Sequence, residues 1–493
     1  MNSPSLWVLE CLTPVHVGSG EELARDLDYY CHGTTTEIID WEKMVSHPAA
    51  QCLADWIVNR FMRQGGQGGK ASIEQFLRDH HIDSDAIRSR QVSGAVEASR
   101  IRLAIRAADG RPIIPGSALK GAIRTLLLTG LAAAPKEPHQ SRNDHAKRGL
   151  EEAIASRKSP KFRAQPLEQA IFRRALRPEI VPSHSKLRND PKGDLLRMLK
   201  ITDAFFPSEK LDVLSTKALG TNRNTLTAVE ALVVGARALV SLQLRDQFLE
   251  QRLFSDSLPD LETLARWSRE HARHLLDGDM EFFKRVNGGA RADRTLLEGC
   301  EELRDLIAKS ETNAREAIFL RLGWGTGWRT MTGDLLSREQ RQALYGKGGQ
   351  TARYVGCDKT RKVILDGHSA NGAPRSLLGW VCIRPPAGDD EMRALAKQTR
   401  APALAPRPAP QSVSAPQSAP IPPASDSLLK RIEALRPSDR GRVQALADDI
   451  AHAEPQRREQ LIESFEARLK QVFGKQRRKE IEQIMAKLRA RSQ

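Results

Sequence analysis

A strand-like run that ends in a glycine-rich segment occurs twice in this chain, once near the start and once in the second half. Residues 6–17 are rich in β-forming side chains and lead into Gly18-Ser19-Gly20. Residues 316–322 lead in the same way into the segment 323–328, GWGTGW. Strands that alternate with helices around such loops are typical of α+β sandwiches. The repeat therefore predicts an α+β protein built from two related, ferredoxin-like modules in tandem.

Residues 113–128, with the sequence IIPGSALKGAIRTLLL, contain the clearest helix signal. A Pro-Gly turn signal is followed by Ser117, a good N-cap residue, so a helix is expected to begin there. Lys120 and Arg124 are four residues apart and therefore share one side of that helix. The free N–H groups of the helix start, Ser117 and the two cations would together form a place for a phosphate. The alternative is an ordinary capped helix whose basic residues face solvent.

Composition changes along the chain and divides it into five parts. We predict a first ferredoxin-like module in residues 1–135 and a second in residues 194–384. Between them lies a Lys- and Arg-rich insertion, residues 136–193, which we expect to be partly disordered. Residues 385–424 are rich in Pro and Ala and predict an extended linker. Residues 425–493 show apolar side chains at helical spacing and predict a small all-α module.

The charge of the chain indicates a polyanionic partner. Its formal net charge is +16, and clustered Lys and Arg side chains gain free energy by releasing counterions from phosphates. The six cysteines form no C-x-x-C pair, so neither a zinc knuckle nor a disulfide framework is indicated. No secretory signal or membrane-spanning run is apparent. We expect a cytoplasmic protein with no membrane partner.

Two further segments carry candidate binding residues. Residues 98–107 alternate Arg with apolar side chains, which predicts a half-buried strand with Arg102 on its exposed face. In residues 322–328, LGWGTGW, the glycines allow close approach of the backbone to a ligand, and the tryptophans could stack on bases or contact a partner. The spacing does not match a dinucleotide fingerprint or a P-loop. The pattern therefore indicates a binding segment, and it gives no support for NTP hydrolysis.

Catalytic candidates are weak. His16 precedes the first glycine segment and could act as a general acid or base in RNA cleavage. A single histidine beside a turn is, however, more often structural. No nucleophile motif of the G-x-S-x-G type is present, and no residue pattern indicates a metal site. We expect a non-catalytic protein, with a metal-independent endoribonuclease as the alternative.

Three segments together resemble the RAMP superfamily of CRISPR-associated proteins: 13–20 (TPVHVGSG), 114–124 (IPGSALKGAIR) and 320–328 (LRLGWGTGW). The resemblance is strongest to the fifth subunit of type III-A (Csm) effector complexes. It implies two ferredoxin-like folds, no cofactor, and a subunit that caps the 3′ end of the crRNA and supports crRNA maturation in antiviral interference. The implied partners are the crRNA, the other Csm RAMP subunits, above all the backbone subunit, and host nucleases that trim the crRNA.

The resemblance also implies which residues contact RNA. With Arg102 of the predicted strand, the expected RNA-binding residues are Gly18, Ser19, Gly20, Ser117, Lys120, Arg124, Gly323, Trp324, Gly325, Thr326, Gly327 and Trp328. Two alternatives remain open. The chain could be a RAMP endoribonuclease that processes CRISPR transcripts, or an assembly scaffold that meets RNA already held by other subunits.

Overall fold

The computed structural model describes residues 5–63, 72–133, 194–221, 226–244, 258–286, 291–330 and 360–399, with helical stretches, chiefly 440–451 and 455–473, closer to the C-terminus. The chain divides into two compact units, Met1–Ala403 and Leu404–Gln493. Apart from a few residues such as Phe172, the predicted basic insertion, 136–193, lies outside the described residues. The predicted site belongs to the first unit.

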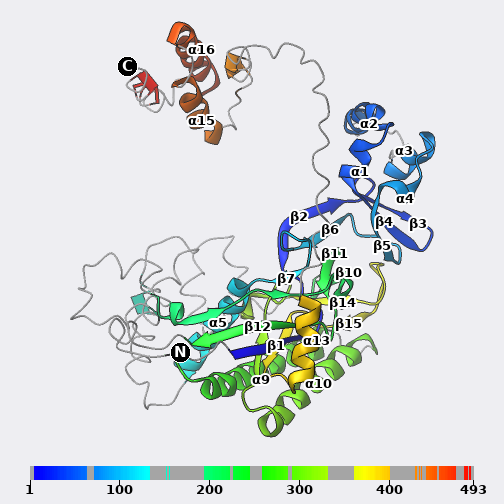
Figure 1. Ribbon diagram of the computed structural model, residues 1–493, viewed down its shortest axis with the longest axis vertical. Coiled ribbons are helices and arrows are strands. Elements are labelled where there is room, and N and C mark those ends of the chain that lie inside the picture. Colours follow the sequence, from blue (N-terminus) through cyan, green and yellow to red (C-terminus); the bar gives the residue numbers. More distant parts are fainter. Residues whose placement is uncertain are drawn as a thin grey trace. The chain divides into compact units, whose positions relative to one another are not determined.

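The first unit contains a five-stranded antiparallel sheet, of which β1 and β12 are labelled in Figure 1. Its strands, in spatial order, are β13 (Ile318–Arg321), β16 (Trp380–Arg384), β1 (Ser5–Cys11), β12 (Arg237–Leu244) and β8 (Leu199–Ile201). The strand β1 lies in the middle, with Trp7 opposite Val240 of β12 and Leu9 opposite Ile383 of β16. Trp7 and Leu9 are buried, as expected for a central strand.

The connections of this sheet follow a ferredoxin-like path. The helix α5 (Gly116–Ala133) lies between β1 and β8 in the sequence, and α9 (Leu261–Val286) lies between β12 and the last strands. Along the chain the four strands come in the order β1, β8, β12, β16, and in the sheet they lie in the order β16-β1-β12-β8. If the strands are numbered 1 to 4 along the chain, this spatial order is 4-1-3-2. This is the β-α-β-β-α-β arrangement of one ferredoxin-like fold. Its strands come from both sides of the predicted insertion.

A second, six-stranded sheet also mixes the two predicted modules. Its strands, in spatial order, are β15 (Pro374–Ser376), β14 (Arg361–Leu365), β10 (Leu211–Leu219), β11 (Thr227–Leu232), β6 (Arg100–Ala104) and β2 (Gly18–Ala24). Only the pair β11 and β6 is parallel. The structure therefore confirms an α+β fold but not two ferredoxin-like modules in tandem, because strand pairing joins segments far apart in the chain.

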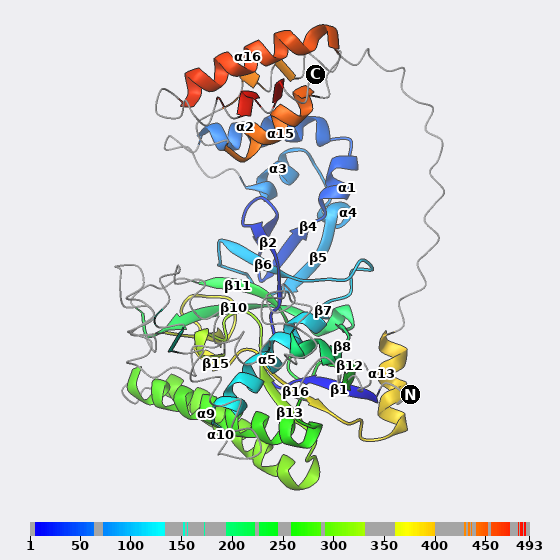
Figure 2. The same cartoon turned by 90° about the vertical axis from the view of Figure 1, so that its left-hand side faces the viewer.

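An insertion between β2 and β6 forms a small body of its own. It contains the sheet of β3 (Tyr29–His32), β4 (Thr35–Ile39) and β5 (Arg88–Ser93), with α1 (Trp41–Ser46), α2 (Ala50–Arg63), α3 (Ile73–Asp79) and α4 (Ser84–Ile87). Met44, Ile73 and Phe76 are at the centre of its core. Figures 1 and 2 show this body at the end of the unit opposite α9 and α10 (Arg291–Asn313). The sequence did not predict it as a separate body.

The helix predicted in residues 113–128 is confirmed. Short strands β7 (Ile113–Ile114) and β9 (Ala204–Phe205) pair just before it, and α5 then runs from Gly116 to Ala133. Leu119, Ile123 and Leu127 are buried in the main core. Near its C-terminal end Gly130 packs against Trp267 of α9, where a Cβ would lie 2.2 Å from the indole. The two helices therefore need a glycine at their contact.

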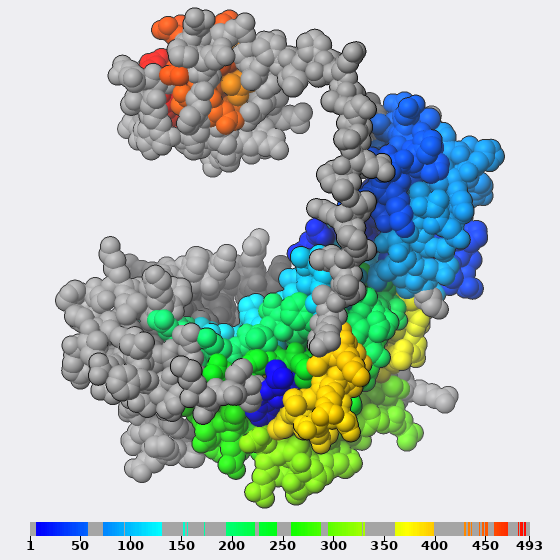
Figure 3. Space-filling view, viewed as in Figure 1, coloured from blue at the N-terminus to red at the C-terminus, as the bar shows by residue number. Residues whose placement is uncertain are grey.

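The predicted linker, 385–424, is wrong at its start. Residues 389–399 form a helix, α13 (Asp389–Thr399), which lies on the surface of the unit in Figure 3 and contacts β12. Its Leu395 is buried, and its Glu391 pairs with Arg384 of β16. The guanidinium of Arg384 lowers the pKa of Glu391 to about 2. These contacts hold a helix in a segment whose Pro and Ala content alone suggested a linker.

The described part of the second unit is mainly helical. It contains α15 (Arg440–Ala451) and α16 (Pro455–Phe473), and its core includes Leu446, Ile450 and Phe465. Within the described parts of both units, no helix is long and apolar enough to cross a membrane.

Candidate nucleic-acid interface

The two glycine-containing segments that the sequence singled out meet in the folded chain. The backbone N–H of Trp324 donates to the carbonyl oxygen of His16 at 2.8 Å. Gly323 has φ +90°, and a Cβ there would lie 2.5 Å from the same carbonyl oxygen. Only glycine combines this backbone conformation with so close an approach. The turn after β1 therefore packs directly against the turn after β13.

The second glycine segment forms a loop that internal hydrogen bonds hold. Gly323, Gly325 and Gly327 all have φ between +85° and +90°. The hydroxyl of Thr326 donates to the carbonyl of Gly323 at 3.0 Å and is 3.0 Å from the hydroxyl of Thr330. Since Thr326 is buried, it supports the loop and does not face a ligand, contrary to its predicted role.

The side chain of Trp324 lies among cations from two strands. The guanidinium carbon of Arg102 on β6 lies 5.0 Å from the ring centroid, and the ammonium of Lys362 on β14 lies 4.2 Å from it. The ring of His16 is perpendicular to the indole, with 5.8 Å between centroids. Cations over an indole are attracted by its π electrons. The half-buried Trp324 therefore holds two positive charges beside each other. We call Arg102, Trp324 and Lys362 the Trp324 cluster.

The two cations of the Trp324 cluster differ in their counterions. Arg102 pairs with Glu22 at 3.0 Å. Among the described residues, no carboxylate lies within 4 Å of the Lys362 ammonium. Burial, and secondarily the positive charge of Arg102, lower the pKa of Lys362 below its ordinary value. A phosphate oxygen placed at this ammonium would supply the missing negative charge.

His16 lies beneath the indole and is not accessible. Its side chain is 2% exposed, and Nδ1 donates to the carbonyl oxygen of Glu230 at 2.5 Å. Nε2 points toward Gly18, where a Cβ would lie 3.1 Å away. Burial lowers the pKa of His16, which keeps the ring neutral at pH 7. The imidazole packs against Trp324 and supports it, and no face of the imidazole is open to a substrate.

Sequence reasoning missed Lys362 and the buried carboxylate of Glu230. One carboxylate oxygen of Glu230 accepts from Arg90 of β5 and from Arg106, the latter at 3.2 Å. The other oxygen accepts from the backbone N–H of Ala104 at 2.8 Å. Glu230 thus joins the inserted body to β6 and β11. A single glutamate inside the apolar run 227–232 was the available signal.

The start of α5 does not form the predicted phosphate site. The N–H of Gly116 donates to the carboxylate of Asp203 at 2.7 Å, so a protein carboxylate occupies this position. The helix begins at Gly116, which places the exposed Ser117 inside the first turn and not at the N-cap. Arg124 pairs with Asp194 and lies 4.6 Å from the ring centroid of Phe172. Internal partners therefore replace the expected ligand.

The remaining predicted residues lie on α5 and in the two glycine-containing segments. Lys120 is partly buried, and burial lowers its pKa. Gly18, Ser19 and Gly20 are exposed, but they begin the edge strand β2 and are not a free loop, with an irregular register between Gly18 and Glu22. Trp328 begins a 3₁₀ turn, Trp328–Thr330. Of the predicted set, Arg102, Gly323 and Trp324 form the core of the candidate interface.

An α+β fold whose surface gathers lysine and arginine around a tryptophan is typical of nucleic-acid-binding proteins. The chain matches a family model described as the RAMP superfamily over residues 8–329. It therefore belongs to the RAMP superfamily, as the three sequence motifs predicted.

Several solved structures resemble the chain, among them the following two. One is a chain of the "Csm-crRNA-target RNA ternary complex in type III-A CRISPR-Cas system", with 21% identity over 76% of this chain and 99% of that chain, and a TM-score of 0.49. The other is Csm5 of T. onnurineus, with 19% identity, the same two coverages and a TM-score of 0.40. No curated protein matches the chain in sequence.

Proposed function

We propose that this chain is a non-catalytic, RNA-binding subunit of a type III CRISPR effector ribonucleoprotein. In this role it caps the 3′ end of the crRNA and packs against the backbone RAMP subunit. Membership of the RAMP superfamily and a formal charge of +16 support the class of function. The observation that carries the proposal is the position of Lys362 beside Arg102 over Trp324, a partly buried ammonium to which the described part of the chain brings no carboxylate.

The Trp324 cluster suits phosphates better than bases. Both cations lie over the indole, so a base could stack on a covered face only after a cation moved. A phosphate between Arg102 and Lys362 would accept hydrogen bonds from a guanidinium and an ammonium without displacing either. Such contacts hold the RNA backbone in place and carry no base specificity. This is what a subunit that binds crRNAs of many sequences requires.

The test is a double substitution, Arg102→Ala with Lys362→Ala, in the full-length protein. We expect the affinity for single-stranded RNA to fall by tenfold or more at low salt, about the effect of losing charge-assisted hydrogen bonds. We also expect log affinity against log salt to become less steep, by about 0.7 for each lost phosphate contact. Fluorescence anisotropy with a labelled oligonucleotide measures both quantities.

The matched control removes the same two charge types from α13, by Arg393→Ala with Lys397→Ala. Both side chains are exposed and lie outside the Trp324 cluster. Equal RNA affinity in the two double variants would contradict the proposed interface. If the wild-type protein bound no RNA yet entered the complex normally, the chain would be an assembly scaffold. Cleavage of a repeat RNA that His16→Ala abolished would instead favour the endoribonuclease, which the burial of His16 does not support.

A further inference from the structure

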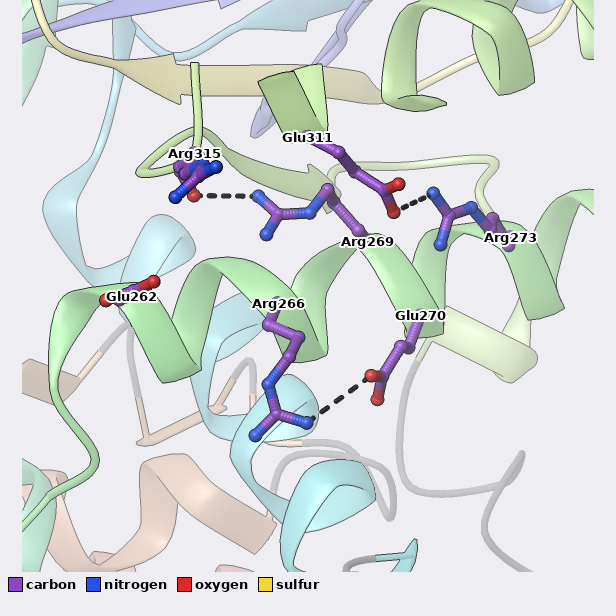
Figure 4. A pocket seen from close by; sticks show the side chains of 7 residues that line it. All are labelled: Glu262, Arg266, Arg269, Glu270, Arg273, Glu311 and Arg315. Carbon is purple, nitrogen blue, oxygen red and sulfur yellow. Dashed lines mark hydrogen bonds and ion pairs between the residues drawn. The ribbon is translucent and has the colours of Figure 1, made fainter. Parts of the chain in front are cut away.

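A second charged site lies on the helical side of the first unit and shares no residue with the Trp324 cluster. It is a pocket of about 310 Å³ beside α9, the end of α10 and the turn that precedes β13. Every side chain that lines it is charged: Glu262, Arg266, Arg269, Glu270, Arg273, Glu311 and Arg315 (Figure 4). The absence of apolar residues from its lining indicates a site for a polar, charged ligand.

Two of the four arginines already have carboxylate partners. Arg273 pairs with Glu311 across the two helices, and Arg266 pairs with Glu270 at 3.5 Å along α9 (Figure 4). Arg269 and Arg315 do not: among the described residues, no carboxylate lies within 4 Å of either guanidinium. The seven lining side chains therefore carry a net charge of +1, and two of the four guanidiniums form no ion pair among the described residues.

Arg269 is the stronger indication, because it is 7% exposed. Its Nη1 donates to the carbonyl oxygen of Arg315 at 2.8 Å, and no other hydrogen bond of the described protein engages the guanidinium. Burial is the main cause that lowers its pKa, and the charges of Glu311 and Glu270 offset this only in part. A buried charge is costly unless an opposite charge compensates it.

We propose that this pocket binds a phosphate group between Arg269 and Arg315. A phosphate offers several acceptor oxygens that two guanidinium groups can share, and arginine is well suited to this geometry. The volume is at the lower end of small-molecule sites, which fits a phosphate with part of a nucleoside. An acidic peptide fits less well, because its further carboxylates would lie near Glu262, Glu270 and Glu311. The phosphate could belong to an RNA backbone or to a free phosphate compound.

Arg315→Gln is the informative variant. It removes one guanidinium from the pocket but keeps the hydrogen bond of Arg269, because that bond ends on the backbone carbonyl of residue 315. The matched control is Arg294→Gln on α10, whose side chain is 82% exposed, pairs with Glu298 and does not line the pocket. Inorganic phosphate is titrated into each full-length protein at constant ionic strength. Both the thermal midpoint and the binding isotherm are measured.

We expect saturable stabilisation by phosphate in the wild type and in Arg294→Gln, and at least tenfold weaker phosphate binding in Arg315→Gln. The variant Arg102→Ala with Lys362→Ala should keep the part of the phosphate response that Arg315→Gln loses, which separates this site from the proposed RNA interface. A short single-stranded RNA distinguishes the sources. A larger loss of RNA affinity in Arg315→Gln than in Arg294→Gln assigns the site to an RNA phosphate, and equal RNA affinities with a lost phosphate response assign it to a free phosphate compound.

Two results would overturn the inference. One is a phosphate response that is absent, does not saturate, or is the same in Arg315→Gln as in the wild type. The other is binding of a poly-glutamate peptide that Arg315→Gln abolishes while phosphate has no effect, which would make the pocket a protein-docking site.

Discussion

At the scale of single residues, two glycines of one loop share a positive φ but differ in the space around them, so their substitution by alanine distinguishes steric contact from backbone strain. Gly323 and Gly327 have φ of +90° and +87°, but a Cβ meets the His16 carbonyl at 2.5 Å in the first and no atom within 4 Å in the second. Gly327→Ala should therefore cost about 1–2 kcal/mol of unfolding free energy, the penalty of a left-handed alanine. Gly323→Ala should cost clearly more and should weaken RNA binding. Denaturant unfolding of both variants measures the difference, and equal losses would show that the two glycine segments do not meet.

The second prediction at this scale is that RNA affinity and stability depend on pH through Lys362. Burial lowers its pKa, so the ammonium loses its proton at a lower pH than an exposed lysine would. RNA affinity should fall as pH rises through that lowered pKa, whereas Lys362→Arg stays charged and should lack this fall. Stability should change in the opposite direction: between the lowered pKa and the ordinary one the unfolded chain binds more protons, so the free energy of unfolding rises with pH. Anisotropy with an oligo(A) strand from neutral pH to about pH 10 tests the binding part, and an identical profile in Lys362→Arg would contradict it.

At the scale of secondary-structure elements, Asp279 of α9 joins the two sheets. Its carboxylate accepts from Arg321 of β13 at 2.5 Å and from Arg361 of β14 at 2.7 Å, and all three side chains are at most 6% exposed. Asp279→Asn would remove the carboxylate that accepts from both buried guanidiniums and should cost about 3–5 kcal/mol of unfolding free energy. The control is Asp277→Asn, two residues away, whose carboxylate is 55% exposed and pairs with Arg304 at 2.9 Å. That exposed pair should contribute no more than about 1 kcal/mol.

Chemical denaturation of both aspartate variants measures these costs. Similar small losses in the two would show that α9 is held to the strands by apolar packing alone, without a contribution from the buried ion pairs.

The same elements show what the sequence could predict. The helix at 113–128 depends on local signals, and the structure confirms it because its apolar stripe, Leu119 and Ile123, faces the core. Which strands pair depends on contacts between distant segments, so the position of β1 between β12 and β16 was not predictable from periodicity. The Trp324 cluster illustrates this for the site. Its residues 102, 324 and 362 share no sequence spacing, and Lys362 joins them only through the pairing of β14 in the second sheet.

At the scale of the whole molecule, both candidate sites lie within the first unit, Met1–Ala403. A chain that ends after residue 403 should therefore fold, bind single-stranded RNA within about threefold of the full-length affinity and keep the phosphate response. The separate unit, Leu404–Gln493, has a core of its own that includes Ile450 and Phe465, so it should unfold independently. Calorimetry should show the full-length transitions as the sum of those of the two fragments. A truncated chain that remained folded but lost most of its RNA affinity would make the helical unit part of the RNA interface, and RNA binding would then require both units.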